Sequence, residues 1–367
     1  MTYNSYNIAP GTPVLVTGAT GFTGQNLVRK LARAGVSIAA VARASSNIGP
    51  LADLPITWFR GEVHDEALIR EAASGRQYIF HLAAAFRDAK STYQDYWNIH
   101  VKSTRLLAEA AVANPDFRRL VQVSTIGVHG HVDNPPADEN APFAPDDDYQ
   151  KTKLEAELWL KEFAAGNNLD YTVIRPCGIY GPGEKRFLKL FKMATGPFFP
   201  LLGQGKCLVH LVHVDDLTNA IILAATHPAA RDQAFIIGAN EAIATADIAT
   251  IVARHFRVKS RIVRLPITPF FWAGDLCEAI CKPLRIEPPI YRRRVAFYSK
   301  DRSFSVDKMR RILGYQPRHN NKTGLRGVAE WYMQEGWLQP KYSEGFYFPP
   351  NWIPLTYPGV DYLAFLL

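Results

Sequence analysis

Short apolar runs alternate with amphipathic stretches along the first half of the chain. The apolar runs predict strands at residues 13–17, 36–42, 56–59, 77–82, 120–124 and 171–175. The stretches between them have helical periodicity and predict helices at residues 25–34, 65–74, 93–113 and 149–165. Strands joined by helices form parallel sheets, so the pattern predicts an α/β fold with a doubly wound parallel sheet.

The pattern changes after residue 181, where Pro, aromatic and basic residues become frequent. We therefore expect a first domain at residues 1–182, to which residues 210–240 return as a helix (214–226) and a strand (234–237). We expect residues 183–209 and 241–340 to form a smaller, mixed C-terminal lobe. Residues 341–367 are rich in aromatic residues and proline, and we expect a tail that lies on the surface or on a partner subunit.

Composition supports a folded, soluble protein, because 47% of the 367 residues are hydrophobic and 21% are charged. The net charge of +8 favours an anionic ligand or peripheral contact with an acidic membrane. The chain has no dense Lys/Arg tract with interleaved aromatic residues, so we expect no nucleic-acid partner. Its four cysteines are scattered, and we expect neither a disulfide framework nor a bound metal.

The N-terminal residues show no basic segment followed by an apolar run, so no signal peptide is expected. The most apolar later stretch, residues 265–284, is interrupted by Asp275, Glu278 and several prolines and is not expected to span a membrane. We therefore expect a cytoplasmic protein.

A glycine-rich segment follows the first predicted strand directly: Thr17-Gly18-Ala19-Thr20-Gly21-Phe22-Thr23-Gly24. Glycines at a strand–helix junction let backbone N–H groups and a helix N-terminus approach a pyrophosphate. The spacing is Gly-x-x-Gly-x-x-Gly, a variant of the dinucleotide fingerprint. The segment therefore predicts a Rossmann-type domain in which Gly18, Gly21, Phe22, Thr23 and Gly24 contact NAD or NADP.

The end of the second predicted strand bears on the choice of dinucleotide. An acidic residue there binds a ribose 2′-hydroxyl, whereas arginine accepts a 2′-phosphate. This chain has Arg43-Ala44-Ser45-Ser46 and no acidic residue. Arg43 therefore favours NADP over NAD, although a solvated loop charge is an alternative explanation.

Tyr149 and Lys153 lie one turn apart on a predicted helix. A free tyrosine has a pKa near 10 and is a poor base at neutral pH. A neighbouring ammonium stabilises the phenolate and lowers that pKa, which makes the pair suitable for proton transfer at an alcohol oxygen. Upstream, the strand at 120–124 ends in Ser124 and Thr125, whose hydroxyls can orient that oxygen at the carboxyl edge of the sheet.

Together these features resemble the extended short-chain dehydrogenases/reductases, also called NAD-dependent epimerases/dehydratases. Further similar motifs run to about residue 338. They are His81-Leu82-Ala83-Ala84, Arg175-Pro176, Tyr180-Gly181-Pro182-Gly183, His213-Val214-Asp215-Asp216-Leu217 and Leu313-Gly314-Tyr315-Gln316-Pro317. The resemblance implies a Rossmann lobe with a substrate lobe, a homodimer, and an oxidoreductase or epimerase.

The resemblance also implies roles for individual residues. Thr125, Tyr149 and Lys153 would form the catalytic set, with Ser124 beside the substrate and Lys153 also holding the nicotinamide ribose. Glu62 and Val63 stand where the family has an acidic and an apolar residue near the adenine. The further implied cofactor contacts are Leu82, Ala83, Ala84 and Pro176.

The chain departs from the family at several positions. His100 replaces a usual Asn, and we leave open whether it serves the site or packs in the helix. Ile126-Gly127 stand where 4,6-dehydratases have Asp-Glu, so a sugar dehydratase is not expected. Gly178 and Val209 replace an Asn and an Arg of UDP-sugar epimerases.

Two substrate classes remain open. Lys185, Lys189 and Lys192 would share one face of a helix and could hold a diphosphate, which favours a nucleotide sugar. The alternative is an apolar alcohol or ketone, because the C-terminal third resembles 3β-hydroxysteroid dehydrogenases and dihydroflavonol reductases. Residues 269–272 and the aromatic tail could line an apolar pocket or lie on a membrane surface. A non-catalytic NAD(P)-binding protein is a second alternative.

Overall fold

The computed structural model describes residues 8–85, 91–281, 283–284, 288, 290, 292–296 and 299–340. Its centre is a seven-stranded sheet with the order β11-β6-β5-β4-β1-β2-β3, in which all neighbours are parallel. The strands are β1 (Pro13–Thr17), β2 (Ser37–Ala42), β3 (Ile56–Arg60), β4 (Tyr78–His81), β5 (Arg119–Val123), β6 (Tyr171–Pro176) and β11 (Gln233–Ile237). The strand order reverses between β1 and β4, which is where doubly wound sheets bind ligands.

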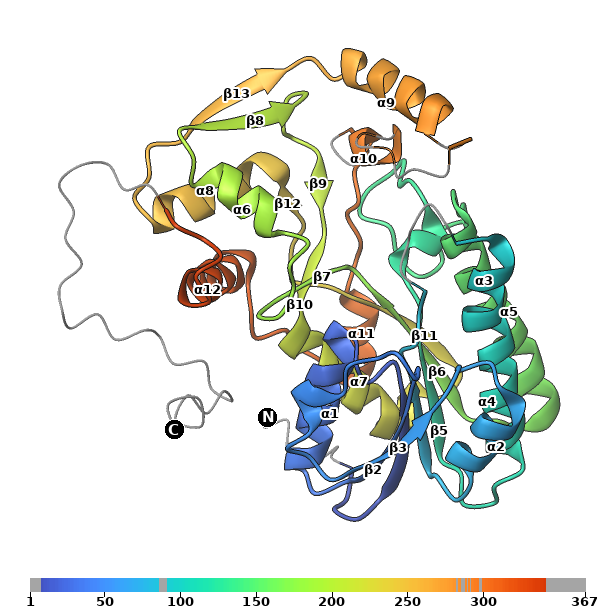
Figure 1. The fold of residues 1–367 in the computed structure, drawn as a ribbon. Coiled ribbons are helices and arrows are strands. Elements are labelled where there is room, and N and C mark those ends of the chain that lie inside the picture. Colours follow the sequence, from blue (N-terminus) through green and yellow to red (C-terminus); the bar gives the residue numbers. More distant parts are fainter. Residues whose placement is uncertain are drawn as a thin grey trace, which may run out of the picture.

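Helices cover both faces of this sheet (Figure 1). One face carries α1 (Phe22–Arg33), α7 (Val214–Thr226) and α11 (Asp307–Leu313), and the other carries α2 (Glu66–Ala73), α4 (Ser103–Val112) and α5 (Asp148–Asn167). Side chains of β1 alternate between the two cores: Val14 and Val16 pack toward α1, and Leu15 packs toward α2. The predicted doubly wound fold is confirmed, and in it α7 packs on the sheet and β11 pairs with β6.

The predicted helix at 93–113 is not continuous. It consists of α3 (Tyr93–Trp97), a π-helical turn (Asn98–Lys102) and α4. π-helical turns insert one residue into an α-helix and are frequent at functional sites. Here the turn contains His100.

The remaining elements form a smaller lobe, at the top of Figure 1. Its core combines α6 (Leu188–Ala194), α8 (Thr245–His255) and α12 (Asn321–Gln334), with Phe191, Val252 and Tyr332 fully buried. Three strand pairs accompany these helices: β7 (Gly178–Tyr180) with β10 (Leu211–His213), β8 (Phe198–Leu202) with β13 (Arg261–Leu265), and β9 (Leu208–Val209) with β12 (Ile243–Ala244). Helices α9 (Thr268–Cys281) and α10 (Arg292–Ala296) follow β13 in the chain. Elsewhere, short 3₁₀ turns are formed by Gly49–Leu51, Ile126–His129 and Pro228–Ala230.

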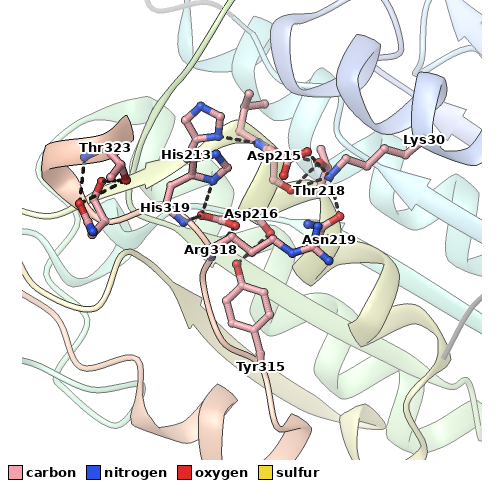
Figure 2. A network of polar contacts seen from close by, with 12 residues as sticks. Lys30, His213, Asp215, Asp216, Thr218, Asn219, Tyr315, Arg318, His319 and Thr323 are labelled. Carbon is pink, nitrogen blue, oxygen red and sulfur yellow. Dashed lines mark hydrogen bonds and ion pairs between the residues drawn. The ribbon is translucent and has the colours of Figure 1, made fainter. Parts of the chain in front are cut away.

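A polar network at the start of α7 joins segments far apart in sequence (Figure 2). Asp216 accepts hydrogen bonds from the backbone N–H groups of Arg318 and His319, both at 2.9 Å. Asp215 pairs with Lys30 of α1 at 2.7 Å. Asp215, Asp216 and His319 lie close enough to share a cation, but both carboxylates already have these partners, so we assign the cluster a structural role.

Within the described ranges, no helix is both long enough and apolar enough to cross a bilayer. The predicted tail at 341–367 lies outside the described residues.

Candidate active site

The glycine loop after β1 lies in close contact with the segment after β4. Gly18 has a φ of +73°, and a Cβ there would lie 2.7 Å from the backbone nitrogen of Ala83. A Cβ on Gly24 would lie 2.1 Å from the Gly18 carbonyl oxygen. Both positions therefore require glycine, because backbone atoms cannot move aside as a side chain can. Helix α1 begins at Phe22, three residues before the predicted start, so Phe22, Thr23 and Gly24 form its first turn.

A buried histidine fixes the segment after β4. The Thr17 hydroxyl donates to Nδ1 of His81 at 2.7 Å and accepts from the N–H of Ala83 at 3.3 Å. Nε2 of His81 lies 3.0 Å from the Ser103 hydroxyl, which itself donates to the Ile99 carbonyl. Burial, assisted by the charge of Lys153, lowers the pKa of His81 to about 3, so the ring is neutral at physiological pH. This network holds Leu82 and Ala83 against the glycine loop.

A cavity of about 1390 Å³ extends from this loop toward the smaller lobe. Among the predicted site residues, those that line it are Thr23, Leu82, Ala84, Ser124, Thr125, Tyr149, Lys153 and Pro176. They come from the carboxyl ends of β4, β5 and β6 and from the first turns of α1 and α5. The structure therefore brings eight of the predicted site residues together around one cavity, among them the three predicted for the chemistry.

Lys153 is buried beneath the cavity, with 2% of its surface exposed. Its Nζ donates to the carbonyl oxygens of Val123 at 3.0 Å and Ala83 at 3.5 Å. Burial lowers the pKa of Lys153 to about 8, while Glu157 one turn further along α5 opposes the shift. At neutral pH the group is therefore largely an ammonium that is pinned between two strand ends.

Glu157 is a residue that the sequence analysis missed. Its carboxylate pairs with Arg175 of β6 at 2.6 Å, and both side chains are about 95% buried. The pair fixes α5 on the sheet edge and so fixes the position of Lys153. The i, i+4 spacing from Lys153 and the Arg175-Pro176 motif could have indicated it.

Two hydroxyl groups lie at the tip of β5, which ends at Val123. Thr125 caps the following turn, and its Oγ1 accepts a hydrogen bond from the Gly127 N–H at 3.0 Å. Ser124 is 4% exposed, and its Oγ has no hydrogen-bond partner among the described residues. Buried hydroxyls normally have partners, so the cavity beside Ser124 is a natural place for a ligand oxygen.

His100 is buried against Tyr149. Its ring meets the Tyr149 ring edge-on at 5.1 Å. The Thr152 hydroxyl donates to the Asp148 carbonyl, so it accepts from Nδ1–H of His100 at 2.8 Å. Nε2 accepts from the N–H of Ala85 at 3.3 Å. His100 is thus neutral and positions the ring of Tyr149 and the segment after β4.

The residues expected at the adenine end of the dinucleotide differ in their exposure. Arg43 and Glu62 are exposed, and Val63 is buried. Arg60, which the sequence analysis missed, donates to the carbonyl oxygens of Ala44 at 2.6 Å and Ser46 at 2.9 Å. This side chain shapes the loop that carries Arg43; its place at the end of the strand beside β2 was the available indication.

The lysine face was wrongly predicted. Helix α6 begins at Leu188, so Lys185 precedes it, and its ammonium lies 4.1 Å from the ring of Trp337. Lys185 and Lys189 are exposed and do not line the cavity. The cationic side chains that do line the cavity, besides Lys153, are Arg186, Arg292, Lys300 and Arg302.

Comparison with known proteins identifies the family. Residues 14–238 match the NAD dependent epimerase/dehydratase family. Short-chain dehydrogenase/reductase family 42E member 1 of Danio rerio is 27% identical over 354 residues, covering 88% of each chain. A 3-beta-hydroxysteroid dehydrogenase of Mycolicibacterium neoaurum is 28% identical, covering 87% of this chain and 91% of that one.

The fold also matches solved structures. A dTDP-glucose 4,6-dehydratase of Streptomyces venezuelae, with NAD bound, superposes with a TM-score of 0.69 at 24% identity, covering 89% of this chain and 99% of the other. At that identity the likeness shows the fold alone. The chain belongs to the NAD-dependent epimerase/dehydratase family of extended short-chain dehydrogenases/reductases, and it is an NAD-dependent oxidoreductase or epimerase.

Proposed function

We propose that this enzyme transfers a hydride between a nicotinamide dinucleotide and the carbon of a secondary alcohol or ketone, with Tyr149 as acid/base. The proposal rests mainly on the common lining of one cavity by Tyr149, Lys153, Thr125 and Ser124, beside the glycine loop. The dinucleotide accepts or supplies the hydride. Its pyrophosphate would lie on the backbone of Gly18–Gly24, where neither Gly18 nor Gly24 has room for a Cβ.

The charges around Tyr149 explain how this residue can transfer a proton. During oxidation, a phenolate at Tyr149 takes the hydroxyl proton of the substrate, and during reduction the phenol returns it. The Lys153 ammonium favours the phenolate. Thr125 and Ser124 hold the substrate oxygen, and His100 supports the ring of Tyr149 from its edge.

We propose that the substrate is an apolar or amphipathic alcohol or ketone. Away from the glycine loop, the cavity wall has a group of apolar side chains, Ile179, Phe187, Leu211, Phe271 and Phe304, beside charged side chains. The lysines that favoured a nucleotide sugar lie outside this wall. The similarity to a 3-beta-hydroxysteroid dehydrogenase supports the same class.

A nucleotide sugar is the second candidate, because Lys300 and Arg302 line the cavity and could bind a diphosphate. A mass spectrum of ligands that co-purify with the native protein separates the two classes. Turnover with a panel of hydroxysteroids, aliphatic ketones and UDP- and dTDP-sugars gives the second measurement.

The Tyr149→Phe variant tests the chemistry. Loss of a positioned acid/base is expected to reduce turnover by about 10²–10⁴-fold and to leave dinucleotide binding nearly unchanged. Tyr93→Phe is the matched control, since Tyr93 is exposed and bonds Glu155 rather than lining the cavity. Normal turnover by Tyr149→Phe would remove Tyr149 from the mechanism.

We further propose a preference for NADP, based on the position of Arg43 at the end of β2. Arg43→Ala is expected to raise the KM for NADPH about 10-fold and to leave that for NADH within about twofold. Equal effects on both cofactors would contradict the preference. The homodimer stays a prediction, which sedimentation equilibrium measures.

A further inference from the structure

Helix α9 presents an apolar stripe to solvent. Trp272, Leu276 and Ile280 follow one another at intervals of four residues, and Leu284 continues the series in the turn after the helix. Their exposed fractions are 69%, 63%, 55% and 63%. Soluble proteins tolerate single exposed apolar side chains, but a stripe of four large ones indicates a docking surface. We call these four residues the α9 stripe.

The adjacent face of α9 belongs to the cavity. Phe271, Asp275, Glu278 and Ala279 line it. The two carboxylates on this face are held by Arg292 of α10, which forms an ion pair with Asp275 and donates its backbone N–H to Glu278 at 2.8 Å. The acidic groups of the helix are therefore directed to the cavity and α10, and the stripe itself carries no charge. One helix thus separates the cavity from the docking surface.

The apolar surface extends beyond α9. Phe198 of β8 is 60% exposed and Val263 of β13 is 36% exposed. These strands pair with each other, and β13 leads directly into α9, so that β8, β13 and α9 follow the outer edge of the smaller lobe (Figure 1). Six of the ten exposed large apolar side chains found in the described part of the chain belong to this edge, which distinguishes it from the rest of the surface.

The positive charge of the protein is concentrated in the same segment. Residues 259–300 contain nine Lys and Arg residues and three Asp and Glu residues, which gives +6 of the net charge of +8. Lys259 is exposed just before β13, and Arg261 and Arg264 are exposed within it. An apolar stripe with basic flanks is the pattern by which helices lie in the interface of an anionic membrane.

We propose that the α9 stripe docks the enzyme on an anionic lipid surface, with the cavity mouth beside the membrane. Trp272, Leu276 and Ile280 insert among the acyl chains, while Lys259, Arg261 and Arg264 contact the headgroups. In this orientation an amphipathic alcohol or ketone passes from the bilayer along α9 into the cavity, a step that rests on the proposed function. Docking itself does not depend on catalysis.

A second copy of the chain is the competing occupant of the stripe. The charge argues for lipid, because two copies related by a twofold axis would bring two sets of exposed basic side chains, Lys259, Arg261 and Arg264, together. An anionic bilayer neutralises that charge and covers the apolar side chains at once.

Vesicle flotation tests the proposal with the full chain. The protein is expected to float with vesicles of phosphatidylcholine mixed with phosphatidylserine and to remain unbound with phosphatidylcholine alone. The double variant Leu276→Ser/Ile280→Ser is expected to lower the vesicle partition coefficient at least about 10-fold. The control is Val112→Ser/Leu158→Ser, which removes two other exposed apolar groups, 41% and 48% exposed, from α4 and α5 and is expected to bind normally.

Three results would overturn docking: no binding of the wild-type protein to anionic vesicles, equal losses in both double variants, or a dimer that Leu276→Ser/Ile280→Ser converts to a monomer. Tyr149→Phe is expected to float like the wild-type protein. Its turnover therefore tests the chemistry separately from the surface.

Discussion

The two ends of the cavity are built on different physical principles. At the glycine loop, backbone packs on backbone, and the closest approaches lie within two segments, 18–24 and 82–83. At the other end, the wall is assembled from side chains of β7, β10, α9 and α10, which are far apart in sequence. Backbone contact restricts residue type strictly, so it leaves a motif. Side-chain walls admit many solutions, so they leave none.

The largest expected effect is on the free energy of unfolding. It separates the destabilisation caused by steric crowding from the destabilisation caused by a positive φ alone. Gly18 and Gly75 both have φ near +70°, but a Cβ at Gly75 meets nothing within 4 Å. Gly75→Ala is expected to destabilise the protein by about 1 kcal/mol. Gly18→Ala is expected to cost roughly 3–5 kcal/mol and to weaken dinucleotide binding more than about 100-fold. Urea unfolding and cofactor titration measure both; equal effects would mean that the loop is not closely packed.

Lys153 gives the next largest effect, in the pH dependence of stability. Its pKa is lowered by burial to about 8, against 10.5 for an ordinary lysine. Between these values the unfolded chain keeps a proton that the folded chain has released, so stability rises with pH in this window. The rise is about 3 kcal/mol across it. Lys153→Met should lack it, which urea unfolding between about pH 7 and pH 10 measures; parallel curves would contradict the burial of a titrating ammonium.

The sequence was sufficient for the sheet and for the elements that bring the predicted catalytic residues to one cavity. All seven strands of the sheet lie within one or two residues of their predicted bounds, because buried parallel strands are short apolar runs. Thr125, Tyr149 and Lys153 meet in one cavity because strand ends and helix starts share the carboxyl edge of the sheet. Their catalytic roles stay predictions.

Long-range contacts account for what the sequence could not reveal. The π-helical turn at 98–102 lets His100 reach both Thr152 and Ala85, partners 52 and 15 residues away. Helical periodicity also failed at Lys185, where the structure has a loop before α6. In both cases tertiary contacts override a local pattern.

Substitution of Ser124 is expected to have a smaller effect, with opposite consequences for stability and for turnover. Its buried hydroxyl has no partner in the described ranges, so Ser124→Ala is expected to leave stability unchanged or slightly higher. If the hydroxyl binds the substrate oxygen, the same variant loses one hydrogen bond in catalysis. Turnover then falls about 10-fold, at unchanged cofactor affinity. A loss of stability with normal turnover would assign Ser124 a structural role.

The smallest expected effect is on KM and tests whether the substrate is charged. The same substitution is made at two lysines, Lys189 and Lys300. Lys189 is exposed on α6 and lies outside the cavity lining, whereas Lys300 is part of that lining. With an apolar substrate, Lys189→Gln and Lys300→Gln should each change KM by less than about twofold, because no anion is lost from either side chain. A diphosphate substrate would raise KM about 10-fold for Lys300→Gln alone. A rise in KM for Lys189→Gln alone would indicate that α6 contributes to the substrate site, which would contradict the geometry of the cavity.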